Sequence, residues 1–202
     1  MTDGIKQLGM FEGYAFANCG VEKIIIPSSV EKITKYCFSD CTKLTRVQFT
    51  ANIEKAKLEE GIFKNCTALN DVVLPDDMLY LGNNMFEKCT SLESIKLPEN
   101  LQELGDYCFK GCSKLASLTI PESIKRIGKY CFEDTYIGKI ALPRSLVEIE
   151  GYAFSGCDSL GAIEFDYFDA IVEIPTEQGL QIIRSNAFAN SKVTNLNIPY
   201  TI

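Results

Sequence analysis

Hydrophobic positions recur along this 202-residue chain with a period of about 23 residues. One phenylalanine marks each unit, and most units have a cysteine three residues later and a leucine six residues later. Two alternating apolar positions then follow, usually with a proline after them. Such self-similarity is the signature of a repeat architecture, in which each unit is one small supersecondary element. The marking phenylalanines are Phe16, Phe38, Phe63, Phe86, Phe109, Phe132, Phe154 and Phe188.

Each unit predicts a short strand followed by tight bends. In residues 95–97, side chains alternate between the two faces, so Ile95 and Leu97 point inward and Lys96 points outward. Proline ends the strand because it lacks a main-chain donor. After it, apolar residues come about every three positions, as at Leu101 and Leu104, which fits neither a long helix nor a long strand.

A single unit cannot bury its own apolar edge, so successive units are expected to stack and share a core. We therefore predict a solenoid in which each unit is one turn and the strands pair in parallel. We expect one array of about eight units over residues 1–202, with Phe38, Phe86 and Phe132 in one aligned stack. An insertion near 166–176 breaks the period, and both ends of the array look uncapped. Either the array continues in a longer protein or another copy covers an end, which predicts self-association.

Over nearly its whole length, about eight units, the chain resembles the BspA-like class of leucine-rich repeats. The resemblance is carried by SIKRIGKYCFED (123–134), KYCFSDCTKLTRVQF (35–49) and GDYCFKGCSKLASLTIPESIKRIG (105–128). The resemblance implies a leucine-rich-repeat solenoid, a right-handed β-rich superhelix with a parallel sheet on its concave side and short 3₁₀ or helical turns on its convex side. Members of this class are commonly found on microbial cell surfaces, where they act in adhesion and host-protein binding. The resemblance thus implies a cell-surface or secreted location. The first residues lack a signal sequence and the cysteines favour a reducing compartment, so the cytoplasm is the alternative.

Composition excludes several function classes. Twenty basic and 27 acidic side chains give a net charge of −7 without a basic cluster, so we expect no nucleic-acid partner. The absence of histidine removes Ser-His-Asp and Cys-His catalysis and every imidazole metal site. The longest aliphatic run, residues 24–26, is too short to insert into a membrane. We expect no enzyme, cofactor or metal; an enzyme acting on glycans with carboxylates alone stays in reserve.

Nine cysteines occupy two phases of the repeat. Because free cysteine behaves as a small buried hydrophobe, we expect a ladder of structural thiols rather than disulfides.

The candidate binding surface is the outward row of the predicted sheet, with a protein of unknown identity as partner. Interface hot spots favour Trp, Tyr and Arg, and only Arg46 in this row is of those types. The alternative, to which we give equal weight, is that this row is an ordinary solvent-exposed sheet face with no binding role. The candidates in this row are Arg46, Gln48, Asp71, Ser94, Lys96, Thr119, Lys139 and Glu164.

Tyr167 and Phe168 in the insertion form a second candidate contact, because insertions in solenoids often lie at a binding face. The favoured alternative is a hairpin or bulge that only extends the sheet. For the whole chain we expect a non-catalytic protein-interaction module, an adhesin-like segment of a microbial surface protein. The alternative is a structural spacer whose function lies outside this chain.

Overall fold

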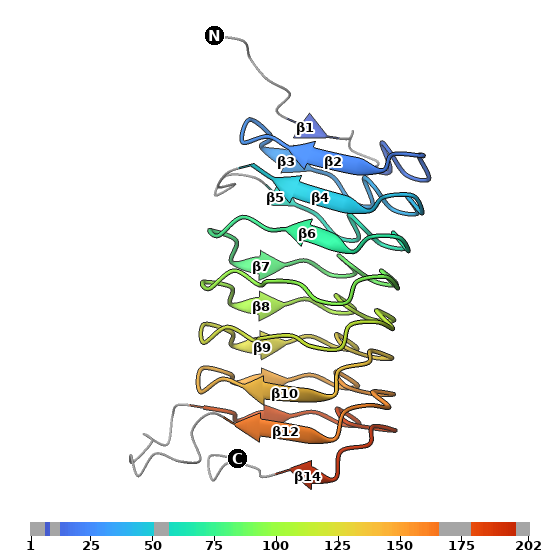
Figure 1. Cartoon of the computed structure of the whole chain (residues 1–202). Helices are drawn as coiled ribbons and strands as arrows, with labels where there is room; N and C mark the ends of the chain where they lie inside the picture. Colours follow the sequence, from blue (N-terminus) through green and yellow to red (C-terminus); the bar gives the residue numbers. More distant parts are fainter. Residues whose placement is uncertain (1–6, 9–12, 51–56, 166–178, 197–202) are drawn as a thin grey trace.

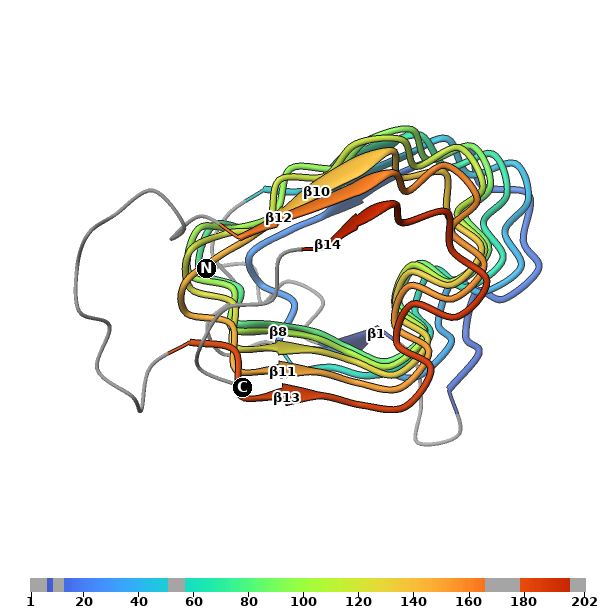
Figure 2. The ribbon, with the colours of Figure 1, turned by 90° about the horizontal axis from the view of Figure 1, so that it is seen from below.

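The computed structural model describes residues 7–8, 13–50, 57–165 and 179–196, and in these ranges the chain forms a stack of similar turns (Figure 1). Most turns contribute to two layers of short strands that face each other across the interior (Figure 2). One layer holds the front strands, and we call its outward side the front face. The other layer holds the rear strands, and we call it the rear sheet. The front strands are β2 (Lys23–Ile26), β4 (Arg46–Phe49), β6 (Asp71–Val73), β10 (Lys139–Leu142), β12 (Ala162–Phe165) and β14 (Asn195–Leu196). The rear strands are β1 (Gln7–Leu8), β3 (Lys32–Ile33), β5 (Lys57–Leu58), β7 (Tyr80–Leu81), β8 (Glu103–Leu104), β9 (Arg126–Ile127), β11 (Glu148–Ile149) and β13 (Ile182–Ile183).

Strand pairing is parallel and keeps the register of the repeat. Ile24 of β2 lies opposite Val47 of β4, and Val47 lies opposite Val72 of β6. Along β2 exposed and buried side chains alternate, as the period-2 pattern predicts. The predicted parallel solenoid is therefore confirmed.

The phenylalanines form one continuous stack along the interior. Neighbouring rings from Phe16 to Phe188 have centroids 5.2 to 5.9 Å apart and planes within 17° of parallel. Phe63, Phe86, Phe109, Phe132 and Phe154 are fully buried. The alignment predicted for Phe38, Phe86 and Phe132 is confirmed.

The bends around each phenylalanine are hydrogen-bonded turns, so the predicted 3₁₀ or helical segments are not confirmed in the described residues. Around Phe109 the amide of Cys112 donates to the Phe109 carbonyl and the amide of Lys110 to the Tyr107 carbonyl. Tyr107 and Gly111 both have positive φ, 60° and 70°. A residue with left-handed backbone interrupts a right-handed helix. Because Tyr107 and Gly111 lie two residues before and two residues after Phe109, the chain there turns and does not continue as a helix.

The cysteines form a second ladder beside the phenylalanines, and all nine are free thiols, as the sequence predicts. Five of them donate the thiol proton to the phenylalanine carbonyl of the preceding turn, over Sγ–O distances of 3.0 to 3.2 Å. Burial raises the pKa of the Cys66 and Cys112 thiols to about 12. The thiols thus act as small buried donors between turns. The donors are Cys41, Cys66, Cys89, Cys112 and Cys157.

The two layers are interrupted at different turns. The front strands form two separate three-stranded sheets, β2-β4-β6 and β10-β12-β14. The rear strands form β1-β3-β5 and a five-stranded sheet that runs β7-β8-β9-β11-β13. The turns between β6 and β10 are therefore held by strand pairing at the rear only.

Within the described ranges, no helix has the length and apolar character that a membrane span requires. The insertion near 166–176, with Tyr167 and Phe168, lies outside the described residues, so the prediction of a second contact there stays a prediction.

Candidate protein-binding face

The predicted site residues in the described ranges all lie on the front face, although they come from six different turns. Arg46 and Gln48 lie on β4, Asp71 on β6, Lys139 on β10 and Glu164 on β12. Ser94, Lys96 and Thr119 lie in the extended segments between the two front sheets. The solenoid thus brings distant residues into one row.

Most charges at the two ends of this row are already paired. Arg46 contacts Asp71 over 3.0 Å and also donates to the side-chain oxygen of Gln48 at 3.3 Å. Lys139 contacts Glu164 over 2.7 Å. These ion pairs are exposed, so each contributes only about 0.2–1 kcal/mol to stability. The paired charges cancel, so the polar side chains of the row that have no ion pair are those in its middle.

The middle of the front face is polar, exposed and unpaired. Ser94, Lys96, Ser117 and Thr119 are all exposed. In the part of the chain that the structure describes, Lys96 has no ion-pair partner, in contrast to Arg46 and Lys139. Lys96 is therefore an exposed basic side chain without an ion-pair partner among the described residues.

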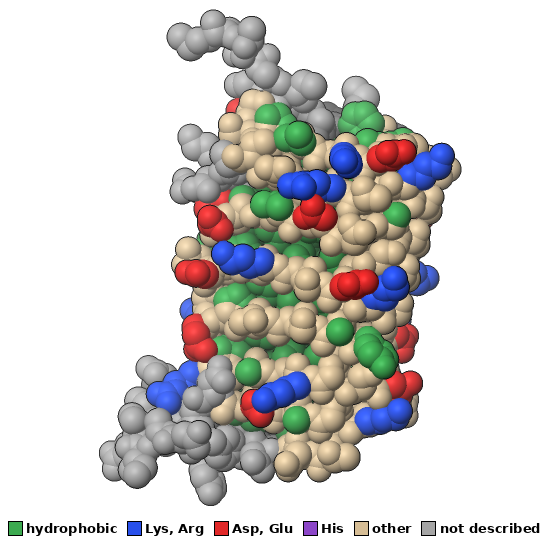
Figure 3. Space-filling view, viewed as in Figure 1, with side chains coloured by type: hydrophobic (Ala, Val, Ile, Leu, Met, Phe, Trp, Pro, Cys, Tyr) green, Lys and Arg blue, Asp and Glu red, His purple; other side chains and the backbone are tan. Residues whose placement is uncertain are grey.

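An open groove of about 540 Å³ runs between these middle turns. Its rim carries Ser94, Lys96, Ser117 and Thr119, and Ile95 and Leu118 line its floor. Figure 3 shows hydrophobic side chains in stripes between the middle turns of this face.

The charge of the front face has the opposite sign to that of the whole chain. Among its described outward positions, four side chains are basic and two are acidic, whereas the full chain carries −7. The row therefore carries a small positive charge on an acidic chain. The basic residues are Lys23, Arg46, Lys96 and Lys139, and the acidic ones are Asp71 and Glu164.

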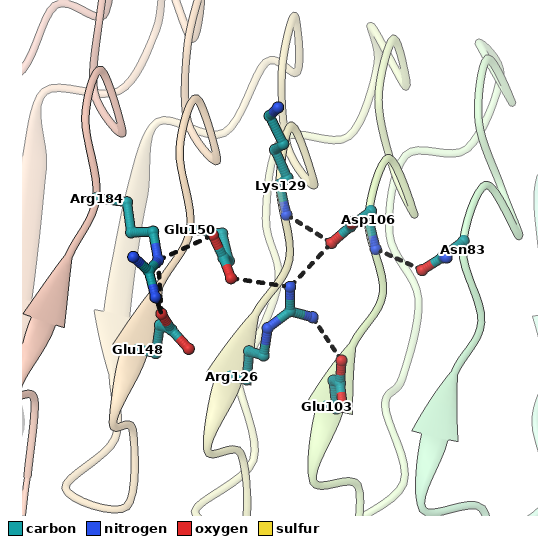
Figure 4. A network of polar contacts seen from close by, with 8 residues as sticks. All are labelled: Asn83, Glu103, Asp106, Arg126, Lys129, Glu148, Glu150 and Arg184. Atoms are coloured by element: carbon teal, nitrogen blue, oxygen red, sulfur yellow. Dashed lines mark hydrogen bonds and ion pairs between the residues drawn. The ribbon is translucent and has the colours of Figure 1, made fainter.

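A second polar cluster, which the sequence analysis missed, lies on the rear sheet (Figure 4). Arg126 of β9 contacts Glu103 of β8 over 2.5 Å, and it contacts Asp106 and Glu150 over 3.1 Å each. Burial alone would lower the pKa of Arg126, but hydrogen bonds to the three carboxylates outweigh it and raise that pKa. One guanidinium thus joins three successive turns.

The same cluster extends along the rear sheet in both directions. Arg184 contacts Glu148 over 2.7 Å and Glu150 over 3.3 Å. Asp106 also accepts the main-chain N–H of Lys129 at 2.9 Å. Arg126 and Arg184 form ion pairs with these carboxylates, so the cluster stabilises the stacking of turns. Among the described residues, no three histidine, cysteine or acidic side chains gather as a metal site would require.

The signal for this cluster is present in the sequence but weak. Glu103, Arg126 and Glu148 occupy the same phase of the repeat and alternate in charge. Strand register places residues of equal phase opposite each other, which is what brings them together.

Stacked turns with parallel strands, a phenylalanine spine and a cysteine ladder define a leucine-rich-repeat solenoid. The chain belongs to the BspA type leucine-rich repeat family, whose repeat region matches in six copies over residues 9–137, 51–161 and 91–202. No curated protein matches the chain.

Solved structures of bacterial leucine-rich repeat proteins are similar to this chain. The T. pallidum leucine-rich repeat protein is 27% identical with a TM-score of 0.65, over 71% of this chain and 70% of that protein. A leucine-rich cell surface protein from Faecalibacterium prausnitzii is 25% identical with a TM-score of 0.62, over 76% of this chain and 41% of that one. A protein from Bacteroides ovatus, at 24% identity and a TM-score of 0.56, shares the fold over 92% of this chain and 57% of its own. The chain thus spans about half of the last two proteins.

Proposed function

We propose that this chain is a non-catalytic module that binds a protein ligand through its front face, as an adhesin-like segment of a microbial surface protein. The observation that carries the proposal is the front row itself. It presents outward side chains from successive turns at a constant register, with a net positive charge on an acidic chain. A regular row of this kind offers an extended contact surface of the sort that solenoid proteins use.

The proposed location is the cell surface or outside the cell. It is supported by the family and by one similar structure, which is that of a cell surface protein. A surface location would place the front face where a protein of another cell or of a host could reach it.

Capture of ligand proteins by the immobilised chain tests this proposal. Extracellular-matrix and serum proteins are passed over the chain, over a front-face variant and over a control variant with the same change in charge. The front-face variant carries Arg46→Glu, Lys96→Glu and Lys139→Glu. The control carries Lys35→Glu, Lys125→Glu and Lys129→Glu, at exposed positions away from the front row.

We expect the unchanged chain and the control to retain the same protein and the front-face variant to lose it. Equal capture by both variants would contradict a front-face site. If the unchanged chain captures nothing, the array is a spacer that sets distance between other parts of a longer protein.

A further inference from the structure

The first cysteine of the thiol ladder is placed differently from those that follow it. Cys41 donates to the Phe16 carbonyl over 3.1 Å, and Cys66 donates to the Phe38 carbonyl over 3.2 Å. Cys19 makes no such bond to a carbonyl among the described residues, and its sulfur lies 3.5 Å from the sulfur of Cys41. No other two of the nine described cysteines have their sulfur atoms in hydrogen-bond contact. The ladder therefore contains one pair of thiols in direct contact.

Access from solvent also distinguishes this pair. Cys19 is half-buried, whereas the other eight cysteines are buried. It lies in the same turn as Phe16, whose ring is 44% exposed. A thiol has to be reached by a dissolved oxidant before it can react with it. Oxidation of the folded chain by such a reagent therefore begins at Cys19.

The main chain holds the two cysteines at a separation that a disulfide bridges. The amide of Asn18 donates to the Ser39 carbonyl over 2.8 Å, so the two turns are paired just before Cys19 and Cys41. Paired extended chains lie about 4.7–4.9 Å apart, and disulfides join Cα atoms about 4.4–6.8 Å apart. The sulfur atoms have to close from 3.5 Å to about 2.0 Å, which rotation of the two side chains supplies.

The surroundings of Cys41 fix the order in which the two thiols react. Burial raises the pKa of the Cys41 thiol, so Cys41 stays protonated near neutral pH and is shielded from a dissolved oxidant. Once Cys19 carries a mixed disulfide, however, Cys41 lies beside the sulfur that it has to attack. Two groups held in contact react without a diffusional encounter, which favours closure of the pair over a second reaction with solvent.

We propose that Cys19 and Cys41 form a reversible disulfide that joins the first two described turns when the chain meets a small disulfide oxidant such as glutathione disulfide. The Cys19 thiolate attacks one sulfur of the oxidant and releases a glutathione thiolate. The Cys41 thiolate then attacks the Cys19 sulfur, forms the Sγ–Sγ bond and releases the second glutathione thiolate. Each released thiolate takes up the proton that the attacking cysteine gave up, so two protein thiols are oxidised and one oxidant is reduced to two thiols.

The bond would secure the turn in which Phe16 is exposed. It closes the chain between residues 19 and 41 into a loop, and a disulfide stabilises mainly by restricting the unfolded chain. The inference goes beyond the proposed function, because the bond needs no ligand. The proposed location outside the cell would supply the oxidising surroundings in which disulfides form and persist.

Mass spectrometry of the oxidised chain tests the site. The folded chain is treated with glutathione disulfide at about pH 8, then denatured, alkylated and digested. We expect one cross-linked peptide pair, Cys19 with Cys41, and seven alkylated cysteines in place of nine. Dithiothreitol is expected to restore all nine.

Three variants test the order of the steps. In Cys41→Ser we expect the reaction to stop with glutathione bound to Cys19. In Cys19→Ser we expect the loss of free thiols to be at least about 10-fold slower, because the remaining thiols are buried. The matched control is Cys66→Ser, one turn further along the same ladder, which should form the Cys19–Cys41 bond at a rate within about 2-fold of the unchanged chain.

Amide hydrogen exchange measures whether the bond joins the turns. The amides of Phe16 and Asn18 donate to carbonyls of the next turn, each over 2.8 Å. We expect both to exchange at least about 10-fold more slowly in the oxidised chain, and dithiothreitol to reverse the change.

Three results would overturn the inference. The first is a chain that keeps glutathione on Cys19 with Cys41 present and forms no cross-link. The second is a Cys19 disulfide between two copies of the chain in place of the bond to Cys41. The third is unchanged exchange at Phe16 and Asn18 in a chain that carries the Cys19–Cys41 bond. Capture of a protein by the front face tests the proposed function separately and is unaffected by these results.

Discussion

Each turn of the solenoid contributes one phenylalanine ring and, in most turns, one thiol to the interior. The rings contact each other across turns, and the thiols bond the carbonyl of the phenylalanine one turn before. These two contacts repeat along the chain, so the energy that joins neighbouring turns is nearly the same from turn to turn. A change in one residue is therefore felt by two junctions.

Replacement of a central ring by alanine should be costly. Phe86 is fully buried and its ring centroid lies 5.8 Å from that of Phe63 and 5.6 Å from that of Phe109. We expect Phe86→Ala to lower the free energy of unfolding by about 3–5 kcal/mol, measured by urea denaturation. The control is Phe16→Ala, at a ring that is 44% exposed, where the loss should be clearly smaller. Equal losses would contradict a continuous buried spine.

The thiol ladder predicts a loss of stability in alkaline solution. The pKa of the Cys112 thiol is raised to about 12 in the folded chain by burial, from an ordinary value of 9.0. The unfolded chain releases this proton from about pH 9, while the folded chain holds it, so the stabilisation is complete below pH 9 and is lost as the pH rises toward 12. Each such thiol removes about 1.4 kcal/mol per pH unit in that window.

Urea denaturation of the chain and of Cys112→Ala at about pH 8 and pH 10 checks this effect. The difference in unfolding free energy between the two proteins should shrink by about 1.4 kcal/mol between these conditions. A difference that stays constant would show that this thiol titrates alike in the folded and unfolded chains.

At the scale of the strands, the rear sheet carries the central turns. β7, β8, β9, β11 and β13 pair without interruption where the front row is open. Arg126 reinforces this pairing by contacting carboxylates of the turns before and after its own. The rear sheet therefore holds the central turns together where the front strands are not paired.

Removal of this guanidinium should weaken the central turns. In Arg126→Ala, Glu103 and Asp106 lose their cation and Glu150 keeps only Arg184, and we expect a loss of about 1–3 kcal/mol in unfolding free energy. Arg184→Ala removes a more exposed cation, 53% against 29% for Arg126, and should cost at most about 1 kcal/mol. Thermal or urea unfolding of both variants measures the difference. A larger loss in Arg184→Ala would contradict the central role of Arg126.

The spine could be predicted from the sequence because its period places every phenylalanine at one point of the turn. The open groove could not, since residues 95–98 and 118–121 carry the same apolar alternation and proline as the paired strand of residues 140–143. Whether a ladder closes depends on how whole turns sit on one another, which no single unit encodes. The 3₁₀ or helical bends stay unconfirmed, because residues with positive φ such as Tyr107 limit each bend to a turn and the apolar pattern does not reveal them.

The whole molecule is a rod with two layers of strands, one at the front and one at the rear. Interior contacts run through all described turns, so the rod is continuous, and the layers are interrupted at different levels. The rear sheet therefore supports the front face at the turns between β6 and β10, where the front strands are not paired. The front face carries a small positive charge, whereas the full chain has a net charge of −7.

Amide hydrogen exchange of the free chain, resolved by residue, tests this account most directly. We expect the amides of Lys96 and Thr119 to exchange about 100-fold faster than those of Ile140 and Ile163, which lie in paired strands. Equal, strong protection at all four positions would mean that the front ladder is closed, and it would contradict the interruption of the front layer between β6 and β10.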